Sequence, residues 1–78
     1  MKYVKFRTDR GCAVSGIRHI EINDKYPSPD LYNVVVYCEM GYNIYIEGES
    51  RHSFLKLFYE CSFIDITEMC DITVTKCG

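Results

Sequence analysis

The sequence predicts a single small α+β domain spanning residues 1–78, with an antiparallel or mixed sheet of four to five strands and one helix packed on one face. Three observations support this fold class. Alternating apolar and polar residues recur along the chain, two strand-like runs flank a glycine-containing turn near its middle, and one segment has helical periodicity. The expected order is therefore strand, strand, strand, strand, helix, strand.

The first two strands are expected near the N-terminus. Residues 2–7 alternate between apolar and polar side chains, which is typical of a half-buried strand. A polar turn over 8–11 leads to a second strand over 12–22, where Gly16 interrupts the alternation and indicates a bulge. We expect the two strands to pair as an antiparallel hairpin. The next segment, 23–32, contains two prolines and predicts a long loop.

The stretch from 33 to 47 predicts a β-hairpin, because β-branched and aromatic residues lie on both sides of Gly41. A three-residue loop over 40–42 would pair Tyr37 with Tyr45, so that one face is aliphatic and the other carries tyrosines and acids. A two-residue loop with Gly41 at its second position would instead pair Tyr37 with an isoleucine. We expect the first register, although tight three-residue loops usually have glycine at the last loop position.

A helix is expected over residues 51–61, with Ser50 as its N-cap. Residues 62–68 are compatible with either a connector or a short strand. Residues 71–76 alternate again and predict the last strand, whose exposed edge would leave homodimerisation open. The apolar stripe of the helix consists of residues at helical spacing: Phe54, Leu57, Phe58 and Cys61.

Composition places further limits on the protein. Hydrophobic residues make up 47% of the chain, which favours a folded domain over a disordered one. No apolar run is long enough to span a bilayer, and the charged N-terminal stretch lacks the apolar region of a signal peptide. The five cysteines, an odd number, argue against a secreted disulfide scaffold and predict free thiols. We therefore expect a cytoplasmic protein.

The net charge of −2 is distributed unevenly along the chain. Residues 1–18 carry an excess of four positive charges, whereas residues 19–78 carry an excess of six negative charges. The positive charge of residues 1–18 is smaller than the strongly basic patch of a typical nucleic-acid-binding protein. The negative charge of residues 19–78 would leave most of the surface acidic. Direct nucleic-acid binding is therefore not the expected main function.

The sequence contains no pattern that fixes a reaction, a metal site or a cofactor. Cys70 and Cys77 are the closest cysteines, but six residues separate them, unlike the tight ligand pairs of structural zinc sites. His52 beside Ser53 matches no known nucleophile motif, and none of the five glycines belongs to a phosphate-binding loop pattern. We expect no enzymatic activity, no catalytic residue, no metal and no cofactor.

Tyrosine usage indicates binding instead. The chain contains seven tyrosines, a residue enriched in protein interfaces because it combines apolar area with a polar hydroxyl. The tyrosines and acids of the predicted hairpin would form a surface that suits a protein partner with a basic surface. The residues expected to contact this partner are Tyr37, Tyr45, Glu39, Glu47 and Glu49.

A second interpretation is a protein that binds single-stranded nucleic acid. The outer side of the first predicted strand combines an aromatic residue with basic residues, which can stack on bases and hold phosphates. The basic residues expected to serve this role are Lys2, Lys5, Arg7 and Arg10.

Three features support a comparison with known proteins: the length of the chain, its strand-rich order, and the stretch from Tyr42 to Phe58, YNIYIEGESRHSFLKLF. In these features the chain resembles small phage-encoded anti-CRISPR proteins and related inhibitors of host defence. The resemblance implies a protein of the host cytoplasm that blocks a nucleic-acid-handling complex, such as a CRISPR effector, stoichiometrically. It assigns no functional residue, and the net charge of −2 is smaller than full DNA mimicry would require.

Overall fold

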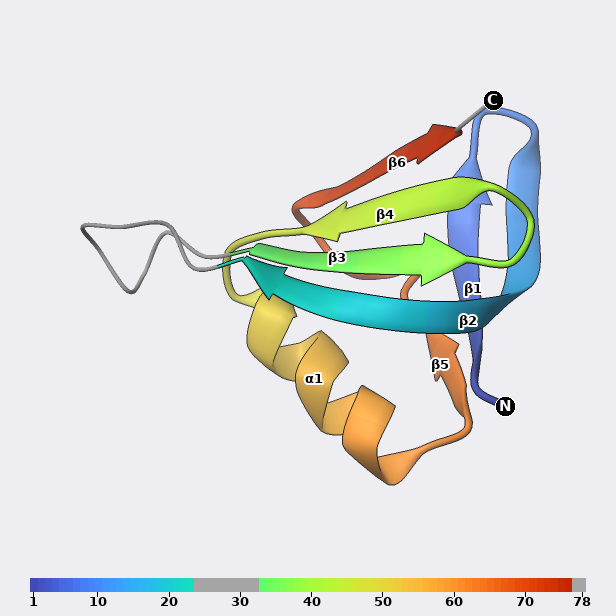
Figure 1. Cartoon of the computed structure of the whole chain (residues 1–78). Coiled ribbons are helices and arrows are strands. Elements are labelled where there is room, and N and C mark those ends of the chain that lie inside the picture. The colour runs from blue at the N-terminus through green and yellow to red at the C-terminus, as the bar shows by residue number, and fades with distance from the viewer. Residues whose placement is uncertain (24–32, 77–78) are drawn as a thin grey trace.

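The computed structural model describes residues 1–23 and 33–76, which form six strands and one helix (Figure 1). The predicted α+β class with a mixed sheet is confirmed, but the sheet has more strands than predicted. Its strand order is β5-β1-β2-β3-β4-β6, with β1 and β5 parallel and the other pairs antiparallel. In chain order the elements are β1 (Tyr3–Thr8), β2 (Gly11–Asn23), β3 (Asn33–Cys38), β4 (Tyr42–Ile46), α1 (Ser50–Glu60), β5 (Phe63–Asp65) and β6 (Ile72–Lys76).

The additional strand is β5, which lies within residues 62–68, the segment for which the sequence was compatible with either a connector or a short strand. Its three residues pair with Tyr3, Val4 and Lys5 of β1. The Tyr3 backbone N–H also donates to the Ser62 carbonyl at 2.8 Å. A three-residue strand is too short to be identified from an alternating pattern in the sequence. Its pairing depends instead on the path by which the chain returns from α1 to β1.

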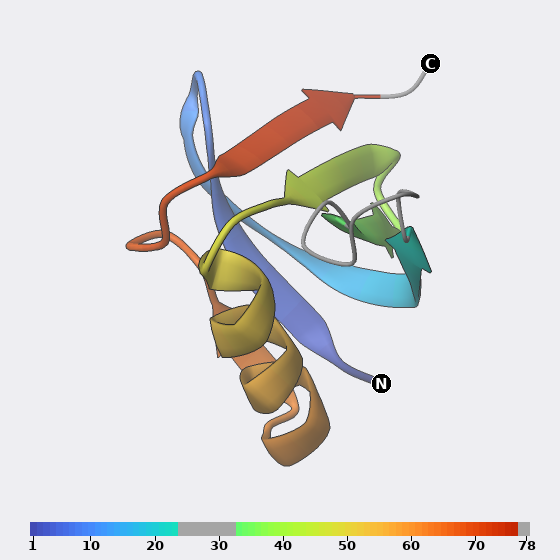
Figure 2. The same ribbon diagram turned by 90° about the vertical axis from the view of Figure 1, so that its left-hand side faces the viewer.

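The sheet bends strongly along β2, whose first part pairs with β1 and whose second part pairs with β3 (Figures 1 and 2). The predicted antiparallel pairing of β1 with β2 is confirmed. An irregularity of register lies between Ile17 and His19, close to the bulge predicted at Gly16. Gly16 itself keeps its place in the ladder opposite Tyr3. The bend turns the β5-β1 part of the sheet steeply across β3 and β4.

The β3–β4 hairpin has neither of the two predicted registers. Tyr37 pairs with Asn43, and Val35 pairs with Tyr45. Gly41 has a φ of 82°, and its N–H donates to the Cys38 carbonyl at 3.3 Å. The loop therefore precedes β4 and places glycine at its last position, where a left-handed conformation is required. The shift of two residues preserves the predicted faces, because side chains alternate with a period of two.

The inner face of the sheet and one side of α1 form the core. Phe54 of α1 is fully buried and belongs to the same cluster as the inward-facing residues of the sheet. Figure 1 shows α1 beside β5, with which it is in contact. The fully buried apolar residues of the strands in this cluster are Val4, Phe6, Val34, Val36, Ile44, Ile46 and Ile64.

The predicted N-cap of the helix is wrong. Ser50 is the first helical residue, and Glu49 occupies the capping position without a side-chain hydrogen bond to the helix. The Ser50 hydroxyl donates instead to the Cys70 carbonyl at 2.6 Å. This bond ties the start of α1 to the segment before β6. The predicted loop over 23–32 lies outside the described residues, except for Asn23, which ends β2.

Candidate functional site

The candidate site is the outer face of the sheet over β2, β3, β4 and β6, defined as the side opposite the core cluster. Val36 and Ile44, which pair with each other, point into the core, so the neighbouring pair of Tyr37 and Asn43 points outward. The outer face carries His19, Glu21, Val35, Tyr37, Asn43, Tyr45, Thr73 and Thr75. The one helix in the described part of the chain packs on the opposite side.

Three of these side chains form an ordered cluster. The His19 and Tyr37 rings are stacked, with centroids 4.5 Å apart and planes inclined by 17°. The Tyr37 hydroxyl donates to Glu21 Oε2 at 3.1 Å, and Glu21 Oε1 lies 3.8 Å from His19 Nε2. The last contact becomes an ion pair when the imidazole is protonated. The side chains of His19 and Glu21 remain 53% and 47% exposed, so the cluster is both ordered and accessible.

The predicted pair of tyrosines lies on this face, but the two are diagonal neighbours rather than cross-strand partners. Tyr37 is opposite Asn43, and Tyr45 is opposite Val35 on one side and Thr73 on the other. Val35 is only 1% exposed, although it belongs to the outer face. The outer face therefore has a buried apolar residue between two partly buried aromatic residues.

The predicted acids do not form one group. Glu39 follows β3, and its backbone N–H donates to the Gly16 carbonyl at 2.9 Å. Glu47 and Glu49 lie at the other end of the hairpin, where the Glu47 N–H donates to the Asp71 carbonyl at 3.1 Å. Glu21, which was not among the predicted acids, contacts Tyr37. Alternation along β2 predicts its outward direction, but not its contact with Tyr37.

The predicted basic residues are also separated. Lys2 Nζ donates to the Cys61 carbonyl at 2.7 Å and lies 5.2 Å from the Phe58 ring centroid, so it holds the C-terminal end of α1. Arg10 lies beyond the opposite end of β1 and is exposed. Lys5 is paired in register with Asp65 of β5.

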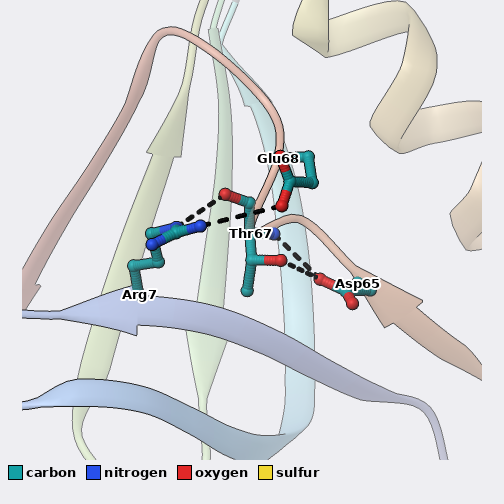
Figure 3. Close-up of polar contacts among 4 residues, drawn as sticks. All are labelled: Arg7, Asp65, Thr67 and Glu68. Carbon is teal, nitrogen blue, oxygen red and sulfur yellow. Dashed lines mark hydrogen bonds and ion pairs between the residues drawn. The ribbon is translucent and has the colours of Figure 1, made fainter.

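Arg7 belongs to a polar cluster that fixes the chain after β5 (Figure 3). Its Nε donates to the Thr67 carbonyl at 2.8 Å, and Nη2 lies 3.7 Å from Glu68 Oε1. The Thr67 hydroxyl and backbone N–H donate to Asp65 Oδ1 at 2.7 and 2.9 Å. These two donors hold the pKa of the Asp65 carboxyl below its usual value, with smaller contributions from Lys5 and Arg7.

The described thiols are free and differ in environment. Cys12 and Cys70 are exposed, whereas Cys38 is buried. Burial raises the pKa of the Cys38 thiol to about 11, against a smaller opposing effect of its hydrogen bond with Ser15. Within residues 1–23 and 33–76, no group of three or more His, Cys, Asp and Glu residues is placed to hold a metal ion.

The geometry therefore defines a small α+β domain that presents an ordered aromatic and acidic sheet face. Models of known protein families do not match the chain, and no similar curated protein or solved structure was found. The helix found in the described ranges is too short and too polar to cross a membrane.

Proposed function

We propose that the protein is a non-enzymatic binding module that holds a protein partner against the outer face of the sheet. The observation that carries this proposal is the His19–Tyr37–Glu21 cluster. Its side chains are fixed by stacking and hydrogen bonding before any partner arrives, so binding would cost little additional side-chain entropy. Tyrosine is also a frequent hot-spot residue, because one side chain supplies apolar area and a hydroxyl group.

The charge of this face favours a basic partner surface. Glu21 lies within the face, and Glu39, Glu47 and Glu49 are exposed at its two ends. Such a distribution would accelerate association with a positively charged surface and disfavour acidic competitors. Proteins that handle nucleic acids carry such surfaces. A CRISPR effector complex, blocked stoichiometrically, is the partner that we propose to test first.

The test is an affinity pull-down of the tagged protein from a bacterial lysate that expresses CRISPR effector complexes, followed by identification of bound proteins and nucleic acid. Two double variants probe the face: Tyr37→Ala with Tyr45→Ala, and Glu47→Lys with Glu49→Lys. The matched control is Tyr59→Ala with Glu60→Lys, because both residues are exposed on α1, away from the outer face.

We expect recovery of an effector complex, with affinity reduced about tenfold or more by each outer-face variant and unchanged by the α1 control. Circular dichroism of each variant establishes that it is folded. If folded outer-face variants retain the partner as well as the unsubstituted protein does, the proposed binding face is wrong. If no effector is recovered, that class of partner is withdrawn.

A second candidate function is single-stranded nucleic-acid binding by the outer side of β5, β1 and β2. Tyr3 and Phe63 are neighbours in register and are 45% and 52% exposed, beside Lys5 on the same side of β1. Exposed aromatic rings beside a lysine can stack bases and contact phosphates. Retention of a single-stranded oligonucleotide that falls steeply with salt and is lost in Tyr3→Ala would support this function. Salt-independent retention, or none, would exclude it.

A further inference from the structure

A groove of about 670 Å³ lies on the inner side of the sheet, away from the outer face. The end of β1, the β1–β2 turn, the segment after β5 and strand β6 line it. Tyr42, Ile66, Ile72 and Val74 give it an apolar lining. The Arg7 cluster described above forms part of the groove wall, because the hydrogen bond from Arg7 to the Thr67 carbonyl holds the segment after β5 against β1 (Figure 3). The groove has the size of a typical ligand site.

The groove is bordered by a strand edge that pairs with no other strand of residues 1–23 and 33–76. In the sheet, β6 pairs with β4 and lies at the end of the strand order (Figure 1). Alternate backbone N–H and C=O groups of an edge strand point away from its partner, which makes β6 a template for another strand. Ile72 and Val74 are opposite Ile46 and Ile44, so their side chains point to the inner face. A strand added to β6 would direct every second side chain into the groove.

The charged residues that line the groove favour an acidic ligand. Arg10 and Lys76 line it, and Lys76 Nζ lies 5.4 Å from the Tyr42 ring centroid. Arg7 also lines it, with part of its charge balanced by Glu68. Asp9 is the acid among the lining residues. The groove is thus a positively charged region in a protein whose net charge is −2.

We propose that the β6 edge binds an extended acidic segment of another protein by strand addition. The backbone of that segment pairs with β6, and the side chains that it directs into the groove are apolar beside Ile72 and Val74 and acidic beside Arg10 and Lys76. This is a second binding site, on a different surface from the outer face, and it does not depend on the function proposed for that face. Main-chain pairing supplies affinity in this mode, and the alternate side chains supply specificity.

The probe is a short peptide, Glu-Thr-Val-Thr-Val-Thr-Glu, blocked at both ends, whose glutamates and valines share one face of the strand. Binding is measured by titration of the ¹⁵N-labelled protein. We expect chemical-shift changes in β6 and the β1–β2 turn, and slower exchange of β6 amide hydrogens with solvent. Methylation of the backbone nitrogens of either the threonines or the glutamates and valines should abolish binding, and methylation of the other set should not. This asymmetry follows because only one edge of the peptide pairs with β6.

Two charge variants test the specificity. Arg10→Glu combined with Lys76→Glu should weaken peptide binding by about tenfold or more, whereas Lys56→Glu on the exposed side of α1 should not change it. Equal binding of the peptide in which lysine replaces both glutamates would overturn the proposal. So would equal binding of both methylated peptides, which would indicate a site for apolar anions such as decanoate. Dimerisation through β6, detected by light scattering, with no binding of the peptide would overturn it as well.

Discussion

Replacement of Phe54 by alanine should destabilise the domain severely. Phe54 is fully buried, stacks on Phe58 with ring centroids 5.9 Å apart, and is the buried apolar residue by which α1 enters the core. Truncation of such a phenylalanine costs about 3–5 kcal/mol, because the transfer energy is lost and a cavity remains. A chain of 78 residues is expected to have a total free energy of unfolding of roughly 4–12 kcal/mol. The substitution therefore removes a large part of the stability.

The assay is urea unfolding followed by circular dichroism. With a slope of about 1–1.5 kcal/mol per M for a small domain, the midpoint should fall by about 2–5 M. Tyr59→Ala is the matched control, because Tyr59 is 72% exposed on the same helix and should change the stability by no more than about 0.5 kcal/mol. If Phe54→Ala and Tyr59→Ala unfold at the same midpoint, α1 is not anchored through Phe54, and the account of the core is wrong.

Two further predictions concern Cys38 and Gly41. The raised pKa of the Cys38 thiol, from 9.0 to about 11, leaves roughly a hundredfold less thiolate at neutral pH. Iodoacetamide should therefore label Cys12 in the folded protein and Cys38 only after unfolding, with the labelled sites located by mass spectrometry. Equally rapid labelling of both thiols would contradict the burial of Cys38. Gly41→Ala should lower the free energy of unfolding by about 1–2 kcal/mol, because alanine is disfavoured at a φ of 82°. An unchanged urea midpoint would count against the observed hairpin loop.

The regular part of the fold could be predicted from periodicity. Period-two alternation identifies β1, β2 and β6, and it gives the correct faces of the β3–β4 hairpin even though the predicted register was wrong. Register depends on the loop, and the preference for glycine at the last loop position was the correct criterion. Sequence could not identify β5, because a three-residue strand is defined by its partner β1 rather than by its own pattern.

The start of α1 illustrates a different limit of prediction from the sequence. Ser50 is a good N-cap residue by type, but its hydroxyl bonds to the Cys70 carbonyl, which is distant in sequence. Local propensity ranks the candidate residues for a helix start, whereas a long-range contact decides what the side chain of Ser50 does. The same reasoning applies to Lys2, whose ammonium group contacts the end of α1 rather than lying free on β1.

The candidate site depends on a single irregularity in β2. Ile17 pairs with Cys38, so an unbroken ladder would place Arg18 opposite Tyr37 and would turn His19 inward, opposite Val36. The observed shift between Ile17 and His19 instead places His19 opposite Tyr37.

This shift makes the stacked and hydrogen-bonded cluster with Tyr37 and Glu21 feasible, and it keeps Ile17 and Ile20 on the inner side. The sequence contains a sign of the shift, since the isoleucines at 17 and 20 are an odd number of positions apart and cannot share one face of a regular strand. The extra residue that β2 contains between Ile17 and His19 therefore has two effects. It keeps both isoleucines in the core, and it creates the outward aromatic cluster on which the proposed binding function rests.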